Sequence, residues 1–137
     1  MMDDLPVARL QRLEKYMRHI RLYADDHGES HFEDIIADLT LQDFAPPASP
    51  FYVSSQTDAA RFSFFELPVG WGGEEHPAPK RQYFICISGC IEMTAGDGER
   101  RLISIGDVVL VEDTHGQGHI TKVIGDESFV AALTQLE

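Results

Sequence analysis

Two glycine-framed segments in the second half of this chain constrain its fold more than any other feature. The first begins at Gly70, carries His76 after five further residues, and ends at Gly89. The second begins at Gly106, after an interval of 16 residues, and leads into a loop that ends in His119. Short strands separated by glycine turns form sandwiches or barrels. Two such segments, each carrying a histidine, predict a small β-barrel with a pocket.

From Phe51 onward the chain has the composition of successive β-strands. The dipeptide Ser88-Gly89 lies between two apolar runs and predicts a two-residue hairpin. Upstream, residues 20–23 are a plausible strand, and residues 32–44 have a mixed pattern that fits strand, turn and strand. The strands expected in the remainder are 61–67, 82–88, 90–95, 101–105, 108–111, 119–124 and 129–136. The sequence therefore predicts an all-β fold.

The N-terminal residues have a different pattern, which predicts one short helix. Leu10, Leu13, Met17 and Ile20 recur at helical spacing, with basic residues on the opposite face. We interpret the basic face as solvated, or alternatively as a surface that docks on an acidic barrel. We expect an N-terminal helical extension over residues 1–20 and a single β-barrel domain over residues 21–137. The proline-rich stretch 45–50 is interpreted as a surface loop within that domain.

Charge and hydropathy restrict the partners of this chain. The net charge is −12, and residues 22–137 alone carry −14 because five of the 11 basic residues precede them. Such a surface repels nucleic acid and anionic membranes. No apolar run approaches the roughly 20 residues of a membrane-spanning helix, and the N-terminus lacks the features of a signal peptide. We therefore expect a cytoplasmic protein with no nucleic-acid or membrane partner.

The first framed segment resembles the first motif of the cupin superfamily. That motif is Gly, five residues, His-x-His, three or four residues, Glu, six residues, Gly. Here the positions fall on Gly70, His76, Ala78, Gln82 and Gly89, with every interval retained. Ala78 stands in place of the second histidine, and Gln82 in place of the glutamate.

The second framed segment resembles the second cupin motif less completely. Gly106 matches, but the loop 112–119 replaces the remainder, and His119 falls two residues late. This loop and the upstream run 28–34 are similar to those of small, single-domain bacterial cupins of uncharacterised function. The resemblance implies a double-stranded β-helix, the cupin jelly-roll barrel, and a homodimer, since cupins often pair through barrel edges.

The resemblance also implies a set of metal ligands inside the barrel. Cupins use three histidines and one glutamate to hold a divalent metal, and the residues left for that role here are His76, Gln82 and His119. Residues 76, 78 and 82 share one parity and can point inward together in an extended backbone. Such donors suit Fe, Mn, Ni, Zn or Cu, although the two replacements should weaken binding. His115, Glu112 or Asp113 could supply a substitute ligand.

Further residues are candidates for the pocket itself. Trp71 and Phe84 either pack the core or line the cavity. The complete set of predicted pocket residues is Trp71, Ala78, Phe84, Glu112 and His115. His27 and His31 lie among acids, in a pattern that could attract a metal. We interpret them as an exposed polar loop, with a catalytic His–acid pair of the sugar-epimerase type as a further alternative. No catalytic residue is assigned.

These observations predict an uncharacterised cupin with an interior pocket for a small organic molecule. One interpretation adds a divalent transition metal at His76 and His119. The alternatives are a metal-free module that binds or senses a small molecule, and a non-catalytic homodimeric partner protein. The motifs of serine hydrolases, phosphate-binding loops, dinucleotide-binding folds and zinc ribbons are absent from the sequence.

Overall fold

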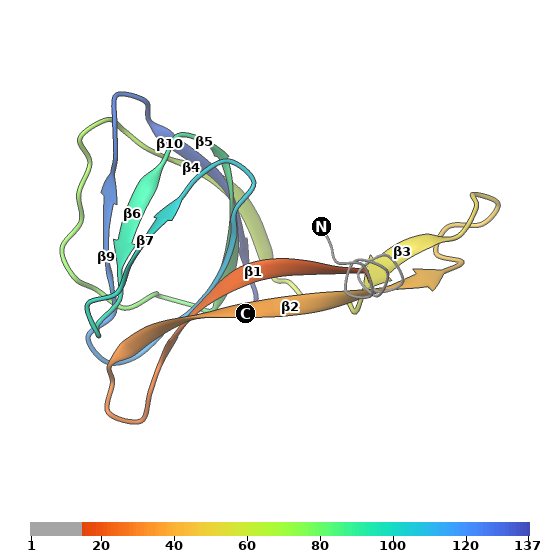
Figure 1. Cartoon of the computed structure of the whole chain (residues 1–137), viewed down its shortest axis with the longest axis horizontal. Helices are drawn as coiled ribbons and strands as arrows, with labels where there is room; N and C mark the ends of the chain where they lie inside the picture. Colours follow the sequence, from red (N-terminus) through yellow and green to blue (C-terminus); the bar gives the residue numbers. More distant parts are fainter. Residues whose placement is uncertain (1–14) are drawn as a thin grey trace, which may run out of the picture. The chain divides into compact units, whose positions relative to one another are not determined.

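The computed structural model describes residues 15–137, which form ten β-strands and no helix (Figure 1). No helix in these residues is long and apolar enough to cross a membrane. The strands are β1 (Lys15–Ala24), β2 (Ser30–Gln42), β3 (Phe51–Ser54), β4 (Arg61–Leu67), β5 (Gln82–Ser88), β6 (Ile91–Thr94), β7 (Arg100–Ile103), β8 (Val108–Glu112), β9 (Ile120–Val123) and β10 (Phe129–Gln135). The predicted all-β class is confirmed.

The chain divides into two compact units, which we describe separately. The first contains residues 1–18 and 35–57, of which 15–18 and 35–57 are described. In it the end of β2 pairs with β3 in antiparallel register, and the rings of Phe44 and Phe51 lie 5.5 Å apart. The second unit contains residues 19–34 and 58–137. The predicted boundary at residue 20 stays a prediction.

The N-terminal residues that the structure describes form a strand and not the expected helix. Residues 15–20, which we expected to end the helix, form the first part of β1. From Ile20 onward β1 pairs in parallel with β8, which satisfies its backbone groups across a sheet. Strand pairing thus prevails over helical spacing here. The rest of the expected helix lies outside the described residues.

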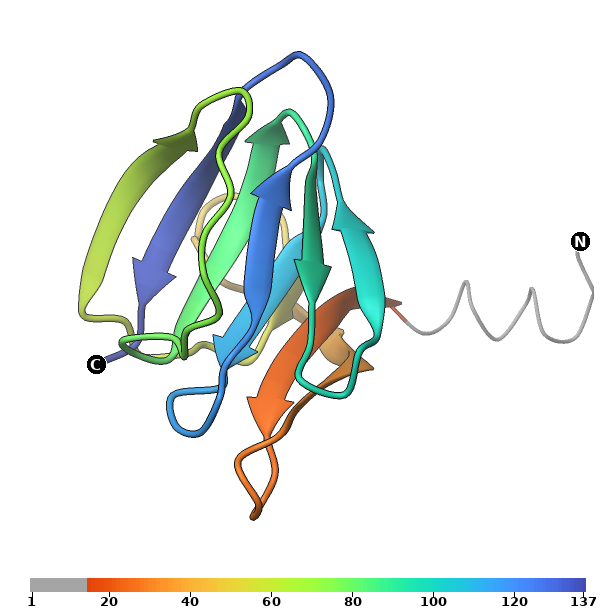
Figure 2. The same cartoon turned by 90° about the vertical axis from the view of Figure 1, so that its left-hand side faces the viewer.

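The second unit is a jelly roll of two sheets that face each other (Figure 2). Its larger sheet has the strand order β2-β1-β8-β5-β10-β4, and its smaller sheet has the order β7-β6-β9. All the registered pairs in these sheets are antiparallel except β1 with β8. Neither sheet closes on itself. The unit is therefore an open version of the expected barrel.

One hydrophobic core fills the space between the two sheets. Along β5, Phe84 and Cys86 face inward, whereas Ile85 and Ile87 face outward, as the period of a strand requires. Burial, followed by the negative charge of Asp107, raises the pKa of the Cys86 thiol to about 11, which keeps it unreactive. Phe129 is fully buried, and its ring centroid lies 6.0 Å from that of Phe84. This aromatic group supports the strands that carry the site.

The position of Phe129 leads to a first prediction. Phe129→Ala should lower the free energy of unfolding by about 3–5 kcal/mol, because it opens a cavity in the core. The matched control is Phe62→Ala on β4, since Phe62 is 63% exposed and Phe129 is 0% exposed. The control should change stability by no more than about 0.5 kcal/mol. Urea denaturation measures both, and equal losses would contradict this placement of the core.

Candidate functional site

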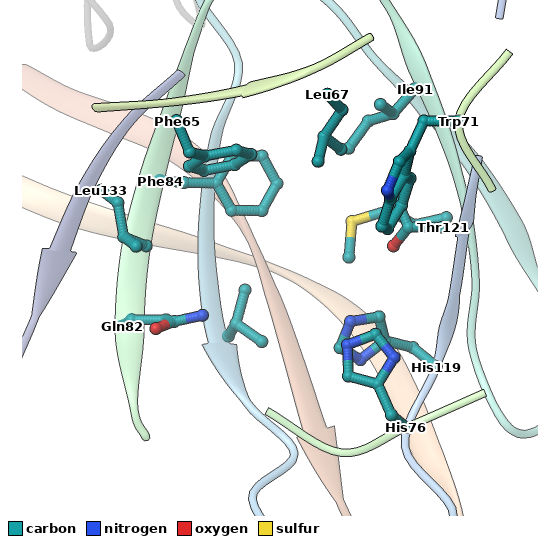
Figure 3. A pocket seen from close by; sticks show the side chains of 12 residues that line it. Phe65, Leu67, Trp71, His76, Gln82, Phe84, Ile91, His119, Thr121 and Leu133 are labelled. Carbon is teal, nitrogen blue, oxygen red and sulfur yellow. The ribbon is translucent and has the colours of Figure 1, made fainter. Parts of the chain in front are cut away.

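A cavity of about 230 Å³ lies inside the second unit, between the two sheets (Figure 3). Strands β4, β5, β8 and β10 of the larger sheet supply one wall, and β6 and β9 of the smaller sheet supply the other. The residues that line it are Phe65, Leu67, Trp71, His76, Gln82, Phe84, Ile91, Met93, Val111, His119, Thr121 and Leu133. Most of these side chains are apolar, and two histidines lie together at one end.

Strand parity explains why these side chains face one another. On β4 the inward residues are Phe65 and Leu67, while Phe62 and Phe64 are exposed on the opposite face. Leu133 of β10 pairs with Phe84 of β5 in the ladder, so both side chains point to the same face. The cavity is thus built from neighbouring inward positions of paired strands.

His76 and His119, the two histidines of the sequence motifs, lie side by side in the structure. They form an isolated antiparallel bridge in which each backbone N–H donates to the other's carbonyl, at 3.1 and 3.0 Å. Their ring centroids are 5.2 Å apart. Backbone pairing therefore fixes the two imidazoles next to each other at the end of the cavity.

Gly118 makes this close backbone approach feasible. Its φ is +85°, and a Cβ added there would overlap the carbonyl group of His76. The carbonyl of Gly118 accepts a buried hydrogen bond of 2.7 Å from Ser30 Oγ. Ser30 also accepts one from the Gly96 N–H at 2.7 Å. The turn between β1 and β2 thereby holds the loop that carries His119.

Asp113 orients the ring of His119. The Nδ1 atom of His119 lies 2.6 Å from Asp113 Oδ2, in a buried contact. Asp113 is fully buried, and its Oδ1 atom has no hydrogen-bond partner among the described residues. A carboxylate accepts hydrogen bonds, so the imidazole nitrogen is the donor. The sequence offers Asp113 as a substitute metal ligand, but in the structure its carboxylate contacts the imidazole of His119.

His76 is held in a corresponding way by the backbone. Its Nδ1 atom lies 2.7 Å from the carbonyl oxygen of Glu74. A carbonyl oxygen can only accept, so Nδ1 of His76 also carries the proton. In a neutral imidazole the other nitrogen is then an acceptor. When neutral, each of the two rings therefore has Nε2 as the nitrogen with a lone pair.

The donor atoms of the cavity do not fit a resident transition metal. Structural and catalytic zinc sites use three or four protein ligands, whereas this lining offers two imidazoles and the amide of Gln82. Gln82 lies across the cavity from the two rings (Figure 3). Among residues 15–137, no group of three His, Cys, Asp or Glu donors includes His76 or His119. Two imidazoles and one distant amide make a weak donor set.

A different group of donors lies at the turn between β1 and β2. Asp25, Glu29 and His31 bring ligand atoms within 4.8 Å of one another, and could hold a metal ion. In the structure His31 Nε2 lies 2.7 Å from Asp25, and Nδ1 lies 2.9 Å from Asp97. The hydrogen bond to Asp25, followed by that to Asp97, raises the pKa of His31. The hydrogen bond between His31 and Asp25 also lowers the pKa of Asp25 to about 2.

The other predicted pocket residues have distinct positions. Trp71 and Phe84 line the cavity, but Ala78 does not: it is buried in the core, and its N–H donates to the Asp113 carbonyl at 3.0 Å. Glu112 follows the inward Val111 on β8, so its side chain has the opposite parity. His115 is exposed, and its Nε2 lies 3.3 Å from the Asp25 carbonyl.

Glu112 belongs to an ion-pair network instead of the cavity. It accepts hydrogen bonds from Arg21 at 2.5 Å and from Arg81 at 2.9 Å. Burial alone would raise the pKa of Glu112, but these hydrogen bonds outweigh it and lower the pKa overall. Sequence reasoning did not identify Ser30 or Gly118 as positioning residues. The Gly-x-Gly-His run at 116–119 was a signal that the backbone there is unusual.

The arrangement of two facing sheets, with motif glycines in the turns and two histidines at one end, is a cupin-like fold. No protein-family model matches the chain, and no curated protein is significantly similar to it in sequence. The solved structures that resemble it include the cupin domain of Cnp3 from Schizosaccharomyces pombe. That domain is 14% identical, with a TM-score of 0.45, over 95% of this chain and 88% of the domain.

Two further solved structures cover a smaller part of the chain. A conserved protein of unknown function from Streptococcus pyogenes is 20% identical, with a TM-score of 0.42, over 62% of this chain and 69% of its own. A protein from Neisseria meningitidis is 15% identical, with a TM-score of 0.41, over 60% of this chain and 84% of its own.

The close approach at Gly118 leads to a second prediction. Gly118→Ala should disrupt the bridge between His76 and His119, because the new Cβ would overlap the His76 carbonyl. Gly98→Ala is the matched control: Gly98 has a φ of +92° but no atom within 4 Å of an added Cβ. The control should lose only the roughly 1–2 kcal/mol of stability that backbone strain at a positive φ costs. Thermal unfolding compares the two, and an equal loss would show that the contact at Gly118 is unimportant.

Proposed function

We propose that this protein binds a small, mostly apolar organic molecule in the cavity between its two sheets, without a resident metal. One observation carries the proposal: the cavity lies in the core, apolar and aromatic side chains form most of its wall, and its polar groups converge at few points. Binding sites for small molecules commonly have this composition. The likeness to other structures adds no ligand to this argument.

The size of the cavity limits the ligand. At roughly 30 Å³ for each water-sized group, a volume of about 230 Å³ holds about eight such groups. This is smaller than the pockets of about 300–1,000 Å³ that take drug-sized ligands. A single aromatic ring with short substituents has the appropriate dimensions.

The pair formed by Asp113 and His119 favours a second candidate function, proton transfer. A buried carboxylate holds Nδ1 of the imidazole, and the ring lines the cavity. An imidazole oriented in this way can act as a general base through Nε2. A ligand with an acidic C–H bond next to the ring would then exchange that hydrogen with solvent, and in D₂O the exchange is detectable by NMR.

A thermal-shift screen of small aromatic compounds tests the binding proposal. Compounds that occupy the cavity should stabilise the protein by about 2.7 kcal/mol at a hundredfold excess over Kd, in EDTA as well as without it. Leu133→Phe fills part of the cavity and should abolish the shift. Leu102→Phe is the control, because Leu102 is exposed on β7.

Two results would contradict the proposal. A shift that survives in the Leu133→Phe protein would place the ligand elsewhere. A shift that requires added Fe, Mn, Ni, Zn or Cu, and disappears with EDTA, would show that ligand binding depends on a metal.

A further inference from the structure

We infer that the cavity selects a two-ended ligand, with a hydrogen-bond donor at the end formed by His76 and His119 and an acceptor at the end formed by Gln82. The inference rests on the proposed function and names the chemical class that the site would bind. It follows from the hydrogen bonds that His76, His119 and Gln82 already make with other residues, which determine the atoms that each can offer to a ligand.

The histidine end presents acceptors. Nδ1 of His76 donates to the Glu74 carbonyl at 2.7 Å, and Nδ1 of His119 donates to Asp113 at 2.6 Å. Each neutral ring therefore has only its Nε2 lone pair left for a ligand. A hydroxyl or amine group can donate to such a nitrogen. A carboxylate would set its own lone pairs against these lone pairs, so neutral rings disfavour it.

The opposite end presents a donor. Gln135 Nε2 donates to Gln82 Oε1 at 3.3 Å, which occupies one of the two lone pairs of that oxygen and orients the Gln82 amide. The amide nitrogen of Gln82 has two N–H donors. Figure 3 shows that nitrogen turned toward the interior of the cavity and the two histidine rings. A ligand group that meets it must accept a hydrogen bond, as a carbonyl oxygen does.

The wall between the two ends favours a flat, apolar body. Phe65 and Phe84 lie on one side of the cavity and Trp71 lies on the other (Figure 3). The hydroxyl of Thr121 both donates and accepts, so it does not discriminate between ligands. The class that satisfies the ends, the wall and the volume is a small aromatic molecule with a hydroxyl or amino group opposite a carbonyl group.

Selectivity in such a site comes from polar groups that a wrong ligand leaves unpaired. A site that hydrogen-bonds a substrate group rejects an analogue that lacks the group. A neutral hydrogen bond contributes about 0.5–1.5 kcal/mol net, which corresponds to a change of about twofold to thirteenfold in Kd. We expect an effect of this size at each end of the ligand.

Four compounds of nearly equal size separate the two ends. They are 4-hydroxyacetophenone, which has both groups; 4-ethylphenol, which has the donor; 4-methylacetophenone, which has the acceptor; and 4-ethyltoluene, which has neither. Their Kd values should be measured by calorimetry or ligand-observed NMR at pH 7 in EDTA, because the acetyl group makes the phenol of 4-hydroxyacetophenone acidic enough to lose part of its donor protons at pH 8. 4-Hydroxyacetophenone should bind about twofold to thirteenfold more tightly than either compound that lacks one of its groups.

Single variants assign each preference to its residue. His76→Leu should weaken the preference for the hydroxyl group and leave the preference for the carbonyl group. Gln82→Leu should do the reverse. His115→Leu is the control, because His115 is exposed and does not line the cavity, and it should change neither preference. His119 is retained because its removal would leave Asp113 buried without a partner.

The outcomes separate this inference from the proposed function. Similar Kd values for all four compounds, or variants that do not change the expected preference, would overturn the inference and leave the apolar binding site in place. If 4-ethyltoluene and the other three compounds all fail to bind, both fail. Tighter binding of 4-methylacetophenone than of 4-hydroxyacetophenone would show that the histidine end does not accept a hydrogen bond from the ligand, and would overturn the inference alone.

Discussion

The site depends on one backbone interaction, the bridge between His76 and His119. Its two hydrogen bonds, of 3.1 and 3.0 Å, join segments that are far apart in the sequence and fix both imidazoles at the same end of the cavity. The bridge requires a glycine at position 118, where a side chain would overlap the His76 backbone. The position of the rings therefore follows from the main chain more than from their own contacts.

The second level of organisation is the hydrogen bonding of the rings. Asp113 and the Glu74 carbonyl each accept a hydrogen bond from an Nδ1–H group, so the same tautomer is set at both histidines by different means. Metal-binding histidines are usually held in this way as well, but the residues that line the cavity include no third imidazole and no carboxylate. The site retains two oriented acceptors within an apolar wall, which suits a neutral organic ligand.

Much of the fold was predictable from the sequence because strand patterns and glycine turns are local signals. The predicted strands 61–67 and 82–88 have the observed limits of β4 and β5. The N-terminal region was harder to predict, because apolar residues recur there at helical spacing. Residues 15–20 nevertheless form the first part of β1, which pairs with β8 from Ile20 onward. The two motif histidines were identifiable from spacing. Long-range contacts, such as that of Asp113 with His119 or of Ser30 with Gly118, have no local signature.

The protonation of the two rings is the feature on which the binding chemistry rests. Long-range ¹H–¹⁵N NMR spectra of the imidazole nitrogens, recorded at pH 8 where imidazoles are normally neutral, observe it directly. His76 and His119 should both show a protonated Nδ1 and an unprotonated Nε2, in contrast to the exposed His27 as an internal reference. A protonated Nε2 on either of the two rings at this pH would contradict the assignment of that end of the cavity as an acceptor.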